Sequence, residues 1–141
     1  MEQNYKNHRQ LVPVWHYITS LLLIAALSLA IVNFIHADAH MHYTAAAVLL
    51  IAFILVIYYV YIRSFALKAQ DRAIRAEENF RHFILTGKPL DKQLRLSQII
   101  ALRFASDDEL PTLAKKAVAE NLSSKQIKQS IQNWKADYNR V

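Results

Sequence analysis

The sequence predicts an all-α protein: a transmembrane helical hairpin whose second span continues as a long cytoplasmic helix, followed by a small three-helix cytoplasmic module. Two long runs are almost wholly apolar, and about 20 such residues suffice to cross a membrane. The 141 residues include only one glycine and three prolines, which argues against turn-rich β structure. Basic residues are concentrated after the second run. A chain of this length corresponds to one compact unit.

The two apolar runs are residues 14–35 and 43–62. The first contains no acidic or basic residue except His16, and the second contains none. Neither has the polar stripe of a helix that packs on a soluble core. The sequence Ala-Asp-Ala at 37–39 imitates a signal-peptide cleavage site. The first run is, however, longer than the roughly 7–15 apolar residues of an ordinary signal peptide, so we favour an uncleaved anchor.

The distribution of charge predicts the side of the membrane on which each segment lies. Lys6 and Arg9 precede the first run, Asp38 lies between the runs, and 15 basic against 9 acidic residues follow the second run. Because basic segments stay in the cytoplasm, we expect a multi-pass protein with both termini cytoplasmic. The expected parts are a cytoplasmic tail (1–13), the transmembrane hairpin (14–62), a juxtamembrane helix continuous with the second span (63–87) and the module (88–141).

The turn between the two runs, residues 36–42, contains four possible metal ligands: His36, Asp38, His40 and His42. If helix continued through the turn, His36 and His40 would share one face. Asp38 or His42 could then complete three N/O ligands for zinc, copper or nickel. The alternative needs no metal, because a turn at the lipid boundary must be polar to satisfy its backbone groups. We favour the structural turn and keep metal binding as an alternative; no other cofactor is predicted.

Beyond residue 62 the second helix carries an apolar stripe with the alternating spacing of three and four that is typical of a coiled coil. We call this stripe the seam; its residues are Ala66, Ala69, Ala73, Ala76, Phe80 and Phe83. Either identical helices pair through the seam as a homo-oligomer, or the module folds back and covers it. We favour the second, because the three heptads are marginal for a coiled coil. Nearby basic side chains are expected to meet anionic lipid headgroups.

The first two helices of the module are predicted from apolar periodicity and capping residues. Residues 92–105 are strongly apolar along one side. A second helix should begin after Ser106, which has capping-box spacing to Glu109, with Asp108 as the alternative cap. It should run to about residue 120. A module of this size buries little surface alone, which favours docking on the long helix.

The third helix of the module is predicted from Ser123 onward, where Gln126 three residues later completes a capping box. Its apolar face at helical spacing consists of Ile127, Ile131, Trp134 and Tyr138. We expect the part of this face that carries Trp134 and Tyr138 to contact a protein partner.

Several classes of function are disfavoured by the residues present. Residues 114–131 resemble a helix-turn-helix in spacing, so a membrane-tethered DNA-binding regulator is one alternative. The candidate second helix offers no arginine for guanine, however, and we argue against nucleic acid as a partner. The sequence has no Gly-rich phosphate loop and no nucleophile elbow. With no cysteine it forms neither disulfides nor thiolate metal sites. We predict no enzyme and identify no small-molecule substrate.

Residues 4–10 and 96–141 resemble a family of small two-span bacterial inner-membrane proteins that is known only as a domain of unknown function. The resemblance implies a bacterial inner-membrane location and assigns no activity, ligand or site residue. Together with the residue patterns, it favours a non-enzymatic anchor, accessory or assembly subunit of a membrane complex. The expected partners are membrane lipid and either a protein or a second copy of the chain.

Overall fold

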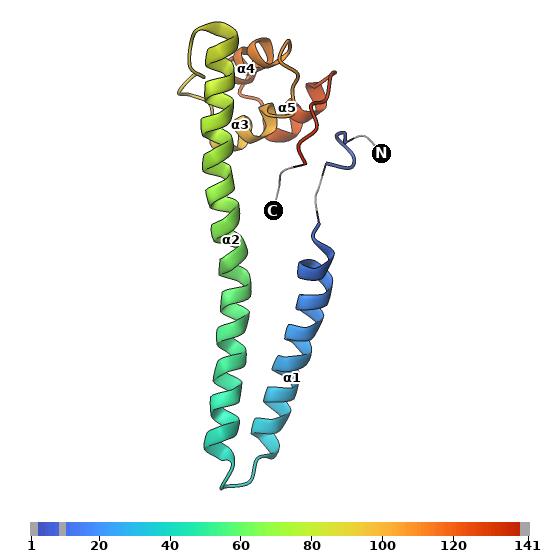
Figure 1. Cartoon of the computed structure of the whole chain (residues 1–141), viewed down its shortest axis with the longest axis vertical. Coiled ribbons are helices and arrows are strands. Elements are labelled where there is room, and N and C mark those ends of the chain that lie inside the picture. Colours follow the sequence, from blue (N-terminus) through green and yellow to red (C-terminus); the bar gives the residue numbers. More distant parts are fainter. Residues whose placement is uncertain (1–2, 9–10, 139–141) are drawn as a thin grey trace. The chain divides into compact units, whose positions relative to one another are not determined.

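The computed structural model describes residues 3–8 and 11–138, and within them the regular structure is helical. The helices are η1 (Val14–Thr19, a π-helix), α1 (Ser20–His36), α2 (His42–Thr86), α3 (Leu96–Leu102), α4 (Leu110–Ala119) and α5 (Ser124–Ser130) (Figure 1). One isolated antiparallel bridge joins Ala105 to Trp134. The all-α prediction is confirmed.

The chain divides into two compact units, and the boundary between them falls inside α2. One unit is residues 11–66, which contains η1, α1 and the first part of α2. The other combines residues 67–141 with the N-terminal segment, of which residues 3–8 are described. Residues close to the start of the chain therefore fold together with residues close to its end.

In the first unit, nearly all apolar side chains point away from the protein. Its buried apolar residues are the small ones, Ala30 on α1 and Ala45 and Ala52 on α2. Leucines on α1 remain exposed, for example Leu29 at 70%. The most apolar windows of the two helices are only 6% and 11% buried inside the protein. Both helices are long and apolar enough to span a membrane, and small residues at their contact let the backbones approach.

Polar contacts gather where the first helix opens as a π-helix. The Thr19 hydroxyl donates to the Val14 carbonyl, and the Trp15 carbonyl accepts a bond from the Tyr59 hydroxyl at 3.1 Å. The Tyr59 hydroxyl also lies 2.6 Å from Ser20 Oγ, and the Trp15 and Tyr59 rings stack with centroids 4.6 Å apart. The wider π-helical turn leaves carbonyl groups available for these bonds.

The second apolar helix continues without a break to Thr86, as predicted. Gly87 follows with φ +71°, and its N–H donates to the Phe83 carbonyl at 2.8 Å. This is the left-handed position that glycine adopts without strain at the end of a helix. The helix therefore ends within one residue of the boundary predicted at residue 87.

The second unit has a core formed by α3, α4, α5 and the segment before α3. Its buried apolar residues are Leu90, Leu94, Ile99, Ala101, Leu102, Ala105, Leu110, Leu113, Ala114, Ala117, Leu122 and Ile127. Gln98 is buried among them and donates from Nε2 to the Leu122 carbonyl at 2.8 Å. The predicted Ser123 capping box is confirmed, because Ser123 Oγ accepts from Gln126 N and Gln126 Oε1 accepts from Ser123 N.

Part of α2 contributes one face to this unit. Ile74, Glu78 and His82 are buried there, spaced four residues apart. The segment after Gly87 is tied to the same helix: the Leu90 N–H donates to Asn79 Oδ1 at 2.9 Å, and His82 Nδ1 lies 2.8 Å from the Lys88 carbonyl. The module is therefore fixed to the last turns of α2 by apolar and polar contacts together.

The first helix of the module is shorter than predicted: it spans Leu96–Leu102 rather than 92–105. Both predicted caps of the second helix are wrong. Helix α4 begins at Leu110, and neither Ser106 nor Asp108 caps it. The Glu109 carboxylate turns away from its own helix and accepts the N–H groups of Gln132 (3.2 Å) and Asn133 (3.0 Å). These bonds serve a distant part of the chain, which spacing within one helix does not reveal.

The predicted last helix is also wrong beyond Ser130. At Ile131 the backbone becomes extended, with ψ 124°. Residues 133–135 then pair with residues 104–106: Ser106 N donates to the Asn133 carbonyl, and Lys135 N donates to the Phe104 carbonyl at 2.8 Å. Trp134 and Tyr138 consequently do not share a helical face with Ile127.

We predict that Leu102→Ala destabilises the module by about 2–5 kcal/mol, because a fully buried leucine leaves a cavity. The measurement is urea unfolding in detergent, followed by Trp134 fluorescence in a Trp15→Phe background, since the chain has two tryptophans. Lys115→Ala, at an exposed position of α4, is the matched control. A change below about 1 kcal/mol for Leu102→Ala would place Leu102 outside the core.

Candidate functional site

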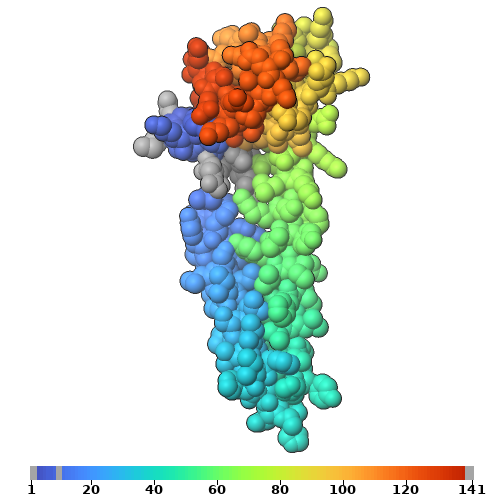
Figure 2. Space-filling model, turned by 180° about the vertical axis from the view of Figure 1, so that it is seen from behind, coloured from blue at the N-terminus to red at the C-terminus, as the bar shows by residue number. Residues whose placement is uncertain are grey.

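The N-terminal segment binds the extended C-terminal segment of its own unit, residues 131–138, through Gln3. Gln3 Nε2 donates to the Asp137 carbonyl at 3.0 Å, and Gln3 Oε1 accepts the Asp137 N–H at 2.8 Å. Its Oε1 also accepts from Trp134 Nε1 at 3.5 Å. The amide thus satisfies both backbone groups of one residue, as a neighbouring strand would. Figure 2 shows the segment (blue) lying against the end of the module (red).

His8 places its ring against an aromatic pair on the module. Phe104 is fully buried and stacks on Trp134 with centroids 4.6 Å apart. The His8 ring lies 5.6 Å from Phe104 and 5.7 Å from Trp134. Its Nδ1 is 2.7 Å from the Tyr5 carbonyl and its Nε2 is 3.0 Å from Lys128 Nζ. This geometry suits a neutral ring with the proton on Nδ1 and Nε2 accepting from the lysine.

Arg81 on α2 joins the long helix to the module through several hydrogen bonds. It donates from Nε to Asp107 at 2.6 Å, from Nη1 to Glu78 at 2.9 Å, and from Nη2 to the Ala105 carbonyl at 2.7 Å. The hydrogen bond and the positive charge of Arg81 lower the pKa of Asp107 below its ordinary 3.8. The predicted capping role of Glu109 is replaced by its contacts with the Gln132 and Asn133 N–H groups.

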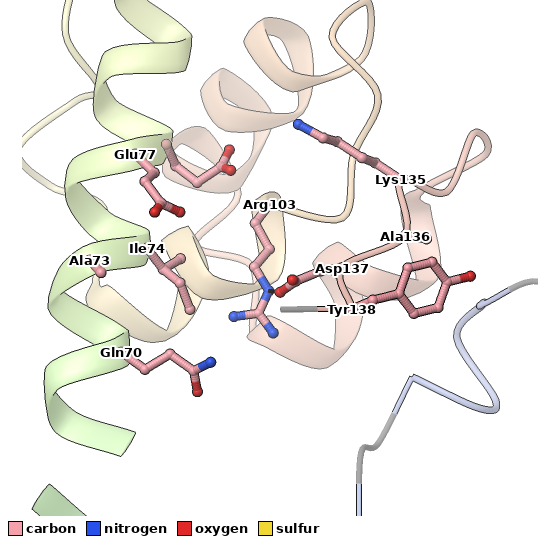
Figure 3. Close-up of a pocket in the computed structure, with 10 residues that line it drawn as sticks. Gln70, Ala73, Ile74, Glu77, Arg103, Lys135, Ala136, Asp137 and Tyr138 are labelled. Atoms are coloured by element: carbon pink, nitrogen blue, oxygen red, sulfur yellow. Dashed lines mark ion pairs between the residues drawn. The ribbon is translucent and has the colours of Figure 1, made fainter. Parts of the chain in front are cut away.

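A cavity of about 410 Å³ lies between α2 and the extended C-terminal segment (Figure 3). Its walls include Glu77 and Glu78 from α2, and Lys135 and Tyr138 from the C-terminal segment. Arg103 is buried and its Nε lies 3.1 Å from Asp137 Oδ2. Figure 3 shows this pair facing each other at one side of the cavity. Arg103 with Asp137 and Glu78 with Arg81 form structural ion pairs, whereas Glu77 and Lys135 are exposed.

A second cavity of about 410 Å³ lies on the other flank of α2, where the segment before α3 crosses the helix. Three cations line it, Arg72 and Arg75 from α2 and Lys92 from the segment, with Asp91 as the one lining carboxylate. Of the basic residues of α2 expected to meet lipid headgroups, Arg72 and Arg75 are therefore exposed on this flank, whereas Arg81 pairs with Glu78 and Asp107.

The four predicted metal ligands of the turn are at the surface. His36 ends α1, His42 begins α2, and Asp38 and His40 lie between them, all exposed. The His42 ring packs on Phe34 with centroids 4.9 Å apart. Within the described residues no group of three or more His, Cys, Asp or Glu side chains is arranged to hold a metal ion.

The seam is exposed along its length in the second unit. Ala69, Ala73 and Ala76 are exposed, as are Phe80 at 64% and Phe83 at 50%, while Ala66 in the other unit is half-buried. The module covers Ile74, Glu78 and His82 on another face of the helix. The module does fold back onto the long helix, but the favoured prediction that it covers the seam is wrong, because it packs on a different face.

The two aromatic residues predicted to contact a partner have different surroundings. Trp134 is half-buried in the stack with Phe104, and Tyr138 is 64% exposed. The sequence reasoning missed Gln3, His8 and Arg81. The only sign of His8 was that it lies in residues 4–10, which resemble a known family; Gln3 lies outside that stretch.

Comparisons with known proteins find one relationship. A family model described as a family of unknown function (DUF6526) matches residues 1–141. Neither the curated proteins nor the solved structures give a match.

We predict that His8→Ala loosens the N-terminal segment, because its ring contacts with Phe104 and Trp134 are lost. Contacts of this kind are each worth about 0.5–1.5 kcal/mol. Amide hydrogen exchange at residues 3–8 should accelerate about threefold to tenfold, with exchange in α3–α5 unchanged. Lys6→Ala, at an exposed position, is the control. Equal exchange in both variants would show that His8 does not hold the segment.

The contribution of Asp107 to the stability of the fold should depend on pH. Because Arg81 lowers the folded-state pKa of Asp107, the ionised carboxylate stabilises the fold above its ordinary pKa of 3.8. That contribution disappears as pH falls through the lowered value. Asp107→Asn should therefore lower the urea midpoint slightly at pH 7, and the difference from the unmodified protein should vanish in acid. The side chain is 63% exposed, so the effect is small. A difference that does not shrink as the pH falls below 3.8 would contradict this assignment.

Proposed function

The chain belongs to this family of unknown function, and we propose that it is a non-enzymatic, membrane-anchored assembly subunit. In this proposal η1–α1 and the first part of α2 span the bacterial inner membrane, and both termini lie in the cytoplasm. The seam on α2 then docks an apolar helix of a protein partner. The module serves as the support that presents α2 at the membrane.

Membrane insertion is supported by the arrangement of apolar side chains in the first unit. Outward-facing leucines and isoleucines surround the two apolar helices, and alanines lie at their contact. Water would disfavour so large an apolar surface, whereas lipid accommodates it. Basic residues outnumber acidic ones before and after the hairpin but not in the turn, which suits cytoplasmic termini.

The shared second unit supports the same topology. Residues 3–8 contact residues 104, 128, 134 and 137 directly, through Gln3 and His8. Two candidate spans separate these segments in the chain. An even number of crossings returns the chain to its starting side, so contact between the two ends requires no further span.

The observation that carries the docking role is the exposed seam on a helix whose other face is already buried. Isolated exposed hydrophobic residues are ordinary, but a contiguous stripe is typical of an interaction site. Outside the candidate span α2 exposes Phe80, Phe83 and Ile84, at 64%, 50% and 66%. Alanines continue this stripe toward the span. The stripe suits a helix that approaches closely through its own small and apolar residues.

The charged residues of the module support a structural role. Arg81, Asp107 and Glu109 hold backbone segments together, and Arg103 pairs with Asp137. Each of these groups therefore has a partner that explains its position without substrate chemistry.

Insertion and topology are tested with single cysteines, because the chain has none of its own. Ala39→Cys in the turn and Ala119→Cys on α4 are both at exposed positions. In intact cells a membrane-impermeant maleimide should label Ala39→Cys and label Ala119→Cys only after lysis. Labelling of both in intact cells, or of neither, would contradict the proposed topology.

The docking role is tested with Ala76→Glu, which places a charge in the seam at a helix-compatible, exposed position. On native gels of membranes in mild detergent, the unmodified protein should run in an assembly larger than 16.3 kDa plus its detergent. Ala76→Glu should abolish that assembly, and Ala119→Glu should preserve it. A monomer in all three samples would refute the proposed function.

A further inference from the structure

We propose that the helix docked on the seam is the same helix of a second copy, running parallel, with Arg72 of each copy opposite Glu77 of the other. This inference rests on the proposed function, because it identifies the partner of the seam. Three independent features of α2 lead to it: the register of the seam, the position of the docked face, and the charges beside the seam.

The first feature is the heptad register of α2. Ala66, Ala73 and Phe80 occupy the a positions, and Ala69, Ala76 and Phe83 occupy the d positions. A stripe that repeats every 3.5 residues on average is the surface through which two similar helices pack. It is self-complementary, because alanines meet alanines and phenylalanines meet phenylalanines when two copies align in parallel. The alanines allow a close approach, and the phenylalanines contribute most of the apolar area.

The second feature is the position of the face that the module occupies. In the same register Ile74 and Arg81 take the b position, Glu78 the f position and His82 the c position. These positions lie on the side of a helix opposite to a and d. Contact with the module therefore leaves the a and d residues exposed, with Ala73 and Ala76 at the edges of the two cavities beside α2. Two copies can pair through them without any change in the packing of the second unit.

The third feature is the pair of charges that flank the seam. Arg72 takes the g position before Ala73, and Glu77 takes the e position after Ala76. Both side chains are exposed, and neither takes part in an ion pair or hydrogen bond within the described part of the chain. They are five residues apart, so they cannot pair within one helix, where ionic partners are three or four residues apart.

These charges distinguish the orientation of the pair. In a parallel, in-register pair, g of one helix faces e of the next heptad of the other, which brings Arg72 to Glu77 twice per dimer. In an antiparallel pair, g would face g and e would face e. Over residues 65–84 the g positions are Phe65, Arg72 and Asn79, and the e positions are Gln70, Glu77 and Ile84. No oppositely charged residues would then meet, so only the parallel arrangement is complementary.

Anchoring in one membrane favours the same arrangement. The helix pair is short, and an isolated coiled coil of three heptads is marginal. Two chains inserted in one membrane with the same topology are already parallel. Their confinement also raises the effective concentration at which the second contact forms. A weak seam can therefore support a dimer that the soluble part alone would not form.

Cross-linking of single cysteines tests whether the partner is a second copy. Ala73→Cys and Ala76→Cys lie at a and d, and Ala119→Cys lies at an exposed position on α4. In native membranes under mild oxidation, the two seam variants should form disulfide-linked homodimers, about twice the 16.3 kDa chain mass. The α4 variant should remain monomeric. Close packing of small residues brings these side chains within disulfide range.

Exchange of charges tests the parallel register. Arg72→Glu and Glu77→Arg each place like charges opposite each other, and each should reduce cross-linking at residue 73 about tenfold. The double variant Arg72→Glu/Glu77→Arg restores opposite charges and should restore cross-linking. Both substitutions introduce residues that favour helix, so loss of folding does not explain the result in any of the three variants. Circular dichroism of each variant verifies this.

The outcomes separate this inference from the proposed function. Suppose that an assembly exists and Ala76→Glu abolishes it, but the seam cysteines form no homodimer. The partner is then another protein, so the inference is refuted and the proposed function stands. If homodimers form but the double charge variant stays weak, the parallel Arg72–Glu77 register is wrong. If no assembly exists in any variant, the proposed function itself fails.

Discussion

The attachment of the module to α2 through Arg81 is the interaction on which the rest of the second unit depends. Arg81 is anchored beside Glu78 on its own helix and donates to Asp107 and to the Ala105 carbonyl. It thereby fixes the backbone that leaves α3. Residues 104–106 of that backbone pair with residues 133–135. The pairing places Trp134 on Phe104, and these rings receive His8. One guanidinium thus connects the long helix, the module and the N-terminal segment.

A charged group can hold this position because its partners are also charged or are carbonyl oxygens. Glu78 is only 9% exposed and Arg81 only 12%. A buried ion pair of this kind contributes little net stability, because both ions lose water. Removal of one partner would be costly, since the other would remain buried without compensation. The pair is therefore better understood as a constraint on how the module is oriented on α2.

The consequence for function is that α2 has two different faces in the second unit. The b, c and f positions hold the module, and the a and d positions remain at the surface. A helix with only one apolar face would bury that face against its own module. In α2, polar and charged side chains make much of the contact with the module, so the seam remains available to another helix.

The sequence predicts the helices well where the determinants are local. The apolar runs, the glycine after Thr86 and the capping box at Ser123 all act within a few residues, and all three are confirmed. The docked face was missed because two of its three buried residues, Glu78 and His82, are polar. The periodicity of apolar residues therefore pointed to the seam instead.

The end of α5 was missed because spacings of three and four at Ile131 and Trp134 fit a helix. The strand pairing that prevails there involves residues almost 30 positions away. The roles of Gln3 and His8 depend on contacts across most of the chain.

The most direct test of the two-faced helix is a single-cysteine scan of α2 over residues 68–85, labelled with a water-soluble maleimide in opened native membranes. We predict slow labelling on two opposite faces, at residues 74 and 82 against the module and at residues 73, 76 and 80 in the seam. Ala119→Cys on α4, an exposed position outside both faces, should label rapidly. Seam positions that label as fast as residue 119 would show that only the module covers the helix, and would contradict pairing through the seam.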